Sequence, residues 1–188
     1  SQPGLLPPET MVYGMRSGAN IEINRDGTVQ LQVGTPDLGQ GSDTAFAIIA
    51  AEELGVRYED VAVTMKDTEA VPWGTSAGSS SGTVLTGNAV KAAAAKAKRQ
   101  LLERASKMLG VPAEDLVSRD RRIFVRGNPE KGLPITDVIR AGAAGGNPWI
   151  IDGKAEYTHP TAYSPPWGAH FAEVEVDTET GEVKVLRL

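Results

Sequence analysis

The chain has 188 residues, of which 40% are apolar and 23% are charged, and its formal net charge at pH 7 is -5. This length and apolar content suit one globular domain or two small lobes that share a core, and they argue against extensive disorder. The acidic balance lacks the basic footprint of a nucleic-acid-binding protein and is a poor match for an anionic membrane surface. We therefore expect neither nucleic acid nor a membrane as a partner.

The sequence contains no cysteine, which excludes disulfides, thiolate zinc sites and cysteine-ligated iron–sulfur clusters within this chain. The two histidines, His159 and His170, are too far apart to suggest a metal motif, so we assign no metal ligand. No run of ~20 apolar residues is present, and the first residues lack the pattern of a secretory signal. We expect a cytoplasmic protein. The ends at Ser1 and Leu188 suggest a fragment or a split subunit.

The first part of the chain predicts an arm, a hairpin and a helix. Prolines and a glycine near the N-terminus predict an extended arm over residues 1–18, followed by one domain over residues 19–188. Apolar alternation on both sides of a turn predicts a β-hairpin with one buried face over residues 21–33. A loop then leads to a helix that Ser42 or Asp43 caps and that ends near Leu54 at Gly55. Because residues 45–51 are continuously apolar, we expect this helix to be buried on most sides.

The remaining chain alternates short strand patterns with helix patterns. Apolar residues at a spacing near 3.6 predict a long helix from Val90 to Met108, with Gly110 as its stop. Its many basic side chains suit either a solvated face or a docking face for an acidic partner. Shorter patterns predict strands at 61–65 and 123–125, a helix at 135–141 and a hairpin at 171–186. The fold class is therefore α+β, a mixed β-sheet with helices packed on one face.

Two glycine-rich segments each carry the chain from a strand to the start of a helix. The first contains Gly39, Gln40 and Gly41, and the second contains Gly78, Ser79, Ser80 and Ser81. Helix N-termini present unpaired N–H groups and partial positive charge, and glycine lets a ligand approach the backbone closely. Serine hydroxyls and a glutamine amide add donors and acceptors. The pattern therefore suits a phosphate or pyrophosphate.

Taken alone, the two segments also fit a structural role, as a tight turn and a flexible connector. The first lacks the third glycine of a dinucleotide fingerprint, and neither is followed by the lysine of a P-loop. A nucleotide-binding enzyme is therefore disfavoured, while a structural turn and an anion site both stay open.

Several blocks in series resemble the molybdopterin-binding subunits of the xanthine dehydrogenase and aldehyde oxidase family of molybdenum hydroxylases. The resemblance starts near residue 19 and keeps the order of the family to the end of the chain. One block contains the Gly39-Gln40-Gly41 turn, another contains the serine-rich loop, and a third contains His170. The matching blocks are residues 26–29, 34–44, 50–56, 67–83, 87–90 and 168–181.

The resemblance implies a molybdenum-cofactor-binding domain fold in an oxidoreductase that hydroxylates an aldehyde, an N-heterocycle or a similar substrate with oxygen from water. In the family, the Gly-Gln-Gly turn contacts the molybdopterin, and the serine-rich loop contacts its pterin and phosphate end. The implied cofactor is molybdopterin, including its cytosine dinucleotide form. Many relatives carry an arginine where this chain has Ser80 or Ser81. The cofactor-binding residues expected here are Gly39, Gln40, Gly41, Gly78, Ser79, Ser80 and Ser81.

The resemblance also implies what these residues do not supply. The family's upstream glycine-rich turn with an aromatic residue is not in this sequence, nor is the downstream glutamate that acts as the base near molybdenum. No catalytic residue is therefore assigned, and we expect the chain to be catalytically incomplete and to bind the cofactor weakly alone. Expected partners are the rest of the molybdenum subunit and the iron–sulfur and flavin subunits or domains. The alternative is a non-catalytic binding or scaffold module on the same fold.

Overall fold

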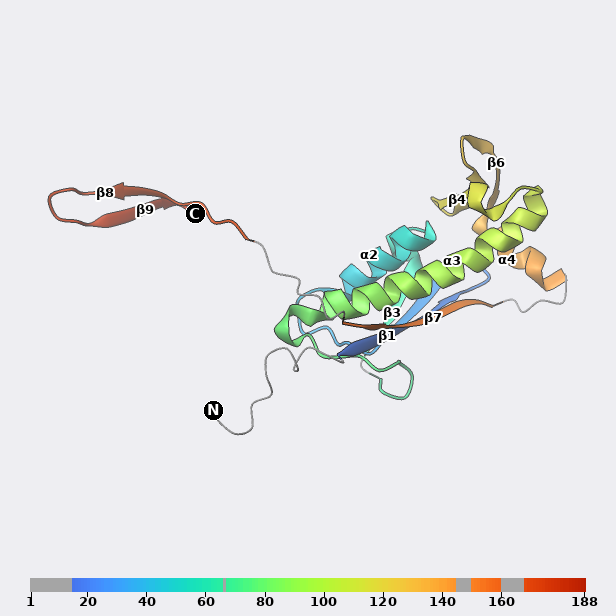
Figure 1. Cartoon of the computed structure of the whole chain (residues 1–188), viewed down its shortest axis with the longest axis horizontal. Helices are drawn as coiled ribbons and strands as arrows, with labels where there is room; N and C mark the ends of the chain where they lie inside the picture. Colours follow the sequence, from blue (N-terminus) through green and yellow to red (C-terminus); the bar gives the residue numbers. More distant parts are fainter. Residues whose placement is uncertain (1–14, 66, 145–149, 160–167) are drawn as a thin grey trace.

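The computed structural model describes residues 15–65, 67–144, 150–159 and 168–188. Its central feature is a four-stranded sheet with the strand order β3-β2-β1-β7, which lies beneath the two longer helices in Figure 1. Three neighbouring strands pair antiparallel, and only β3 runs parallel to its neighbour β2, so the sheet is mixed as predicted. The strands are β1 (Arg16–Ile23), β2 (Val29–Val33), β3 (Val61–Thr64) and β7 (Ile151–Thr158).

The sheet has one apolar and one polar face, because alternate residues of a strand point to opposite sides. This confirms the predicted hairpin with one buried face. β1 begins at Arg16, inside the range expected for the arm, and residues 1–14 lie outside the described residues. The buried set of the hairpin is Ile21, Ile23, Val29, Leu31 and Val33, and the opposite set is Asn20, Glu22, Gln30 and Gln32.

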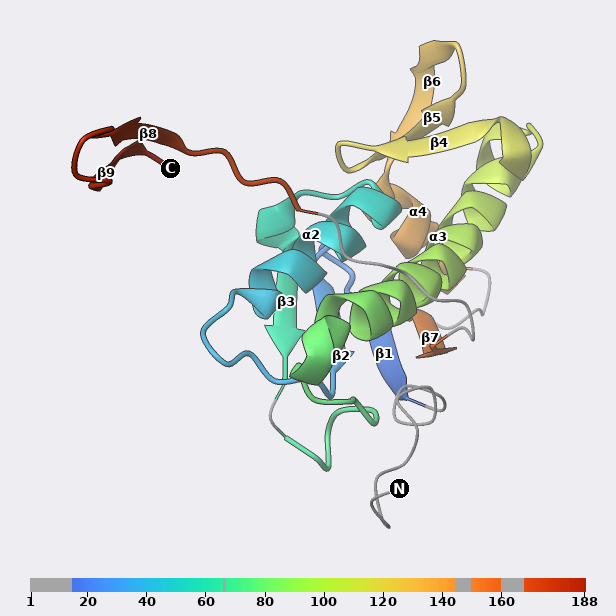
Figure 2. The same cartoon turned by 60° about the vertical axis from the view of Figure 1, so that its left-hand side comes forward.

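Two helices, α2 (Ser42–Leu54) and α3 (Asn88–Leu109), pack on the apolar face of the sheet. Both end at a glycine in the left-handed conformation, Gly55 and Gly110, as predicted. α2 is less buried than its apolar sequence suggests, and Ile48 is 52% exposed. The reason is that α2 packs on the sheet and α3 along one stripe, which leaves its outward side open (Figure 2).

α3 approaches the sheet closely because its inner face is built from small residues. Ala93, Ala94 and Ala97 are fully buried there. On the facing strand, Gly153 of β7 lies directly against the Ala93 carbonyl, and a Cβ at this glycine would collide with it. The contact of a helix backbone with a strand backbone fixes the position of α3 over β1 and β7.

A second, three-stranded sheet follows α3 and carries the order β4-β5-β6. The sequence predicts β5 and the helix α4 but not β4 or β6, and α4 continues beyond the predicted end through Ala144. β6 contains glycine, proline and charged residues, so its strand state comes from antiparallel pairing with β5 rather than from its own pattern. The elements are β4 (Leu116–Arg119), β5 (Arg122–Val125), β6 (Asn128–Pro134) and α4 (Ile135–Ala144).

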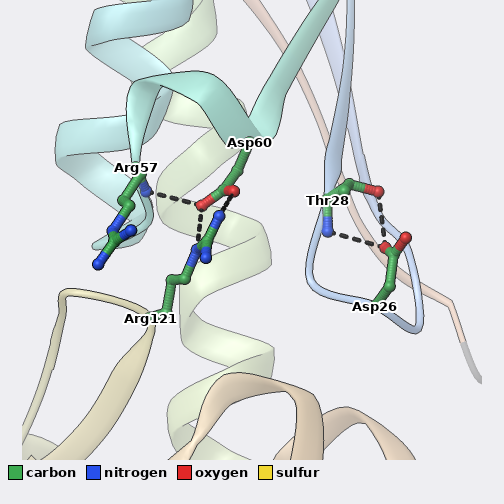
Figure 3. A network of polar contacts seen from close by, with 5 residues as sticks. All are labelled: Asp26, Thr28, Arg57, Asp60 and Arg121. Atoms are coloured by element: carbon green, nitrogen blue, oxygen red, sulfur yellow. Dashed lines mark hydrogen bonds and ion pairs between the residues drawn. The ribbon is translucent and has the colours of Figure 1, made fainter.

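An ion pair joins this second sheet to the connection between α2 and β3 (Figure 3). Arg121, in the turn between β4 and β5, donates from Nε to Asp60 Oδ2 at 2.7 Å and from Nη2 to Asp60 Oδ1. The Asp60 carboxylate also accepts the backbone N–H of Arg57 at 2.9 Å. These bonds, led by the one from Arg121, lower the pKa of Asp60 below its usual range.

The last described element is the predicted hairpin of β8 (Glu173–Val176) and β9 (Val183–Arg187). Every residue of its two strands is exposed, and the hairpin extends away from the main sheet in Figures 1 and 2. Strand alternation and the register place four valines on one of its faces. These are Val174, Val176, Val183 and Val185.

Candidate cofactor-binding site

Both glycine-rich segments lie at one edge of the main sheet. β2 and β3 are parallel neighbours, so their carboxyl ends meet at the same edge. Residues 34–41 leave β2 there, and the segment that returns to α3 leaves β3 there. Figure 2 shows the two loops leaving the lower ends of β2 and β3, one running to the start of α2 and the other to the start of α3. The structure therefore brings together two segments that lie about forty residues apart in the sequence.

The loops that contain the two segments touch through their backbones at Gly34 and Gly74. A Cβ at Gly74 would lie 2.7 Å from the Cα of Gly34, and a Cβ at Gly34 would lie 2.5 Å from the backbone nitrogen of Gly74. Both distances are far inside van der Waals contact, so only glycine fits at either position. Gly82 lies near the same place, with ordinary spacing to Thr35.

Buried hydroxyl groups form hydrogen bonds next to this backbone contact. Thr35 donates to the carbonyl oxygen of Thr75 at 2.7 Å and lies 2.6 Å from the hydroxyl oxygen of Thr86. On the other side, Ser17 of β1 accepts the backbone N–H of Thr75 at 3.1 Å. Ser17, Thr35 and Thr86 are fully buried, an unusual position for side chains of this type. The sequence patterns missed these three residues, since only the tertiary contacts show that they are buried.

The N-cap of α2 is neither Ser42 nor Asp43, and the N–H groups of its first turn are satisfied by Asp37 and, at Thr44, by the Asp43 carboxylate at 2.6 Å. The helix has Gly41 as its N-cap, without a side-chain cap from that residue. Asp37 Oδ2 accepts the backbone N–H of Ser42 at 2.6 Å, and Asp37 Oδ1 accepts that of Gly39 at 2.6 Å. The predicted cap was wrong because Gly41 takes the left-handed conformation and shifts the helix start by one residue. The bond from Gly39 leads the contacts that lower the pKa of Asp37.

The Gln40 side chain folds back onto its own turn. Its Oε1 accepts the backbone N–H of Leu38 at 2.7 Å, and its Nε2 donates to the Ser42 hydroxyl at 3.2 Å. One N–H of the amide stays available on an exposed side chain. Gln40 therefore shapes the turn and still offers a donor to a ligand.

Backbone donors and free space remain at the outer side of this turn. Among the described residues, no group accepts the backbone N–H of Gln40 or Gly41. Gly39 and Gly41 have positive φ angles of 100° and 76°, and a Cβ at either would meet nothing within 4 Å. A bulky anionic ligand can thus reach these N–H groups, and the donors present fit a phosphate or a pterin.

The second segment forms a 3-10 turn, η2 (Gly78–Ser80), before α3. Ser80 is exposed and has a φ of 56°, an unusual left-handed conformation for serine. The Ser81 hydroxyl is buried and donates to the carbonyl oxygen of Gly78 at 2.6 Å, so it serves the turn itself. The side chain of Ser79 lies outside the described part of the structure.

A single π-helical turn, η3 (Thr83–Gly87), connects this segment to α3. Turns of this kind are rare and are frequently found at functional sites. The turn buries Thr86 and Gly87, and Gly87 packs against the Ile49 side chain of α2. It therefore links the start of α3 to α2 at the same edge of the sheet.

The basic face of α3 makes contacts within the fold. The basic side chains of α3 include Lys96, which donates to the Lys154 carbonyl at 2.7 Å, and Lys98, which pairs with Glu53 at 3.5 Å. Both bonds favour a structural role for that face. Within the described ranges, no group of three or more potential metal ligands is present and no helix is long and apolar enough to cross a membrane.

A family model described as the molybdopterin cofactor-binding domain matches residues 4–188. The chain belongs to this family. Its fold is that of the molybdenum-cofactor-binding domains of known enzymes, as a structure of reconstituted CO dehydrogenase from Oligotropha carboxidovorans shows. That structure matches 92% of this chain and 22% of its own chain with 31% identity and a TM-score of 0.78. Quinoline 2-oxidoreductase from Pseudomonas putida 86 matches 90% of this chain and 22% of its own with 27% identity and a TM-score of 0.72.

Relatives of this molybdopterin cofactor-binding domain are much longer proteins. The probable hypoxanthine oxidase XdhD of Escherichia coli strain K12 is 35% identical over 166 residues, which are 88% of this chain and 17% of that protein. The carbon monoxide dehydrogenase large chain of Afipia carboxidovorans is 32% identical over 175 residues, 92% of this chain and 22% of that protein. The domain thus spans about a fifth of the length of these curated relatives. The resemblance inferred from the sequence blocks is confirmed.

Proposed function

We propose that this domain forms one wall of a molybdopterin site in a molybdenum hydroxylase, and that the edge holding the two glycine-rich segments is that wall. The observation that carries the proposal is the open pair of backbone donors at Gln40 and Gly41, at the same end of the sheet as the segment that contains Ser80. The N–H groups of the first turn and the exposed hydroxyl of Ser80 would bind the anionic and pterin parts of the cofactor.

Each expected cofactor residue has a separate part in this proposal. The first turn offers its backbone from Gly39 to Gly41, together with the remaining N–H of the Gln40 amide. In the second segment, the backbone of Gly78 and Ser79 and the exposed hydroxyl of Ser80 would contact the ligand, and Ser81 fixes their turn through its bond to Gly78. When bound, the cofactor supplies the redox chemistry, and the residues of this chain bind and orient it.

The chain contributes positioning, and the rest of a longer subunit would complete the catalytic centre. This inference is supported by the fraction of the relatives that the domain covers, 17% of XdhD and 22% of the carbon monoxide dehydrogenase large chain. We further propose iron–sulfur and flavin subunits or domains as electron-transfer partners, and the cytosine dinucleotide form as one form of the cofactor. The substrate would be an aldehyde, an N-heterocycle or a similar compound.

A matched pair of variants at Ser80 tests the site. Asparagine and aspartate both tolerate the left-handed conformation, so Ser80→Asn and Ser80→Asp differ mainly in charge. A carboxylate beside a bound phosphate would lower cofactor affinity, and we expect molybdenum content at least about fivefold lower in Ser80→Asp than in Ser80→Asn. The measurement is molybdenum and pterin per protein, after the chain is purified together with co-expressed partner subunits.

Equal molybdenum content in the two Ser80 variants would contradict the placement of the second segment at the cofactor. Absence of molybdenum from every complex would instead support the alternative, a scaffold module on the same fold. The isolated chain should bind the cofactor weakly, because it supplies only one wall. Binding at nanomolar Kd, about -12 kcal/mol, by the isolated chain would contradict this expectation.

A further inference from the structure

Thr35 contacts two of the segments that meet at the site edge. It lies just after β2, is fully buried, and its hydroxyl reaches both the Thr75 carbonyl at 2.7 Å and the Thr86 hydroxyl at 2.6 Å. Thr75 belongs to the second glycine-rich segment, and Thr86 belongs to the π-helical turn before α3. One side chain thus joins the chain leaving β2, the loop returning from β3 and the start of α3.

The donors in this cluster can be assigned. A threonine hydroxyl has a single hydrogen, and the hydrogen of Thr35 is directed to the carbonyl oxygen of Thr75. Thr86 must therefore donate to Thr35 in the bond between the two hydroxyls. Loss of the Thr35 hydroxyl breaks two hydrogen bonds and leaves the partly buried Thr75 carbonyl without its donor, whereas loss of the Thr86 hydroxyl breaks one.

We propose that Thr35 is a positioning residue that sets the separation of the two cofactor-binding segments, with Thr86 as its buried partner. The backbones of Gly34 and Gly74 touch beside it, so a small shift of Thr35 changes the place of both segments together. Neither threonine presents a polar atom to a ligand, since both are fully buried. Their effect on a cofactor rests on the proposed function, but their effect on the two segments does not.

The first test is hydrogen exchange on the isolated chain, because it needs no cofactor. The variants are Thr35→Val and Thr86→Val, which keep the shape of threonine and remove its hydroxyl. Thr35→Val should speed amide exchange in both residues 37–42 and residues 76–82 by about tenfold, since local opening loses buried hydrogen bonds. Thr86→Val should speed it by about threefold in the same two segments, and Thr35→Ser should stay close to the original rates.

Ser118 provides the matched control. Its buried hydroxyl donates to the Leu54 carbonyl at 2.6 Å, a long-range bond of the same type in another part of the fold. Ser118→Ala should lower overall stability without changing exchange in the two segments. The proposal is wrong if Ser118→Ala speeds exchange there as much as Thr35→Val does, or if Thr35→Val affects one segment alone. If Thr35→Val does not fold, the amide exchange rates of Thr86→Val are compared with those of Ser118→Ala, and the same two outcomes would contradict the proposal.

The second test measures cofactor retention in the assembled complex. Molybdenum content should fall about tenfold in Thr35→Val, recover in Thr35→Ser and stay unchanged in Ser118→Ala, because only the first change displaces the segments. Unchanged content in Thr35→Val would overturn the positioning role. If Ser80→Asp and Ser80→Asn also retain equal molybdenum, the proposed function itself has failed, and the exchange rates still decide whether Thr35 couples the two segments.

Discussion

Gly74 lies in backbone contact with Gly34 and Thr35, where the loop after β3 passes the loop after β2. We expect Gly74→Ala to destabilise the domain by about 3 kcal/mol, since the new Cβ meets backbone atoms that have no room to move. The control is Gly82→Ala in the same segment, where the new Cβ would lie 3.6 Å from its nearest neighbour. Urea unfolding of both variants tests this, and equal losses would refute the close contact.

At single residues, some structural features can be predicted from the residue type and others cannot. The glycine stops at Gly55 and Gly110 follow from residue type, because glycine adopts the left-handed conformation at little cost. The capping role of Asp37 does not follow from residue type, because its carboxylate reaches the helix start across the four intervening residues 38–41. Nor does the burial of Thr35 and Thr86, which depends on segments that meet only in the folded chain. The candidate site residues remain predictions.

At the scale of elements, the bond between Arg121 and Asp60 fastens the β4–β5 turn to the connection between α2 and β3. Arg121→Asn should lower stability at pH 7, since asparagine keeps the left-handed backbone but loses the guanidinium. Because the folded pKa of Asp60 is lowered, this contribution is present above its unfolded value of about 3.9 and is lost as the pH falls through the folded pKa. The stability difference between variant and parent should therefore shrink below about pH 4.

Arg119→Asn is the control for this prediction. Arg119 lies in the same hairpin and its ion pair with Asp120 is mostly exposed, so its loss should change stability little at any pH. Urea unfolding of the three proteins between pH 7 and pH 3 gives the comparison. A difference for Arg121→Asn that stays constant with pH would mean that Asp60 is not the partner that matters.

Some helices and strands can be predicted from their own residues, and others cannot. Alternation predicted β1 and β2, and a spacing near 3.6 predicted α3, because these patterns persist over several turns or residue pairs. β4 and β6 were missed, since β4 has only four residues and β6 contains proline, glycine and charged residues, so neither shows such a pattern. Their state depends on pairing with β5, whose backbone lies against Gly132 of β6. Family resemblance, rather than periodicity, led to the identity of the cofactor.

At the scale of the whole molecule, the β8–β9 hairpin contributes no buried residue to the core. Removal of residues 168–188 should therefore leave the Tm of the chain within about 2 °C of its original value. It should also reduce self-association, because the four exposed valines of the hairpin form an apolar face without cover. Calorimetry and sedimentation at increasing concentration measure the two effects.

Variants on the two faces of the hairpin show whether the apolar face or the charged face causes self-association. Glu175 and Lys184 are paired opposite each other on the other face of the hairpin. Glu175→Gln with Lys184→Gln should leave self-association unchanged, whereas Val174→Thr with Val185→Thr should lower it. A large fall in Tm on removal of residues 168–188 would show that the hairpin supports the core.

The pairing of β1 with β7 has a consequence for how this chain folds. Ile23 pairs with Ile151 and Arg16 with Thr158, so β1 gains its second neighbour only after both long helices and the second sheet have been synthesised. Closure over so long a stretch of chain slows folding. Until then the nascent chain presents an unpaired strand edge beside apolar residues, a template for pairing with other chains. Aggregation during synthesis is therefore most favoured in the interval before β7 leaves the ribosome.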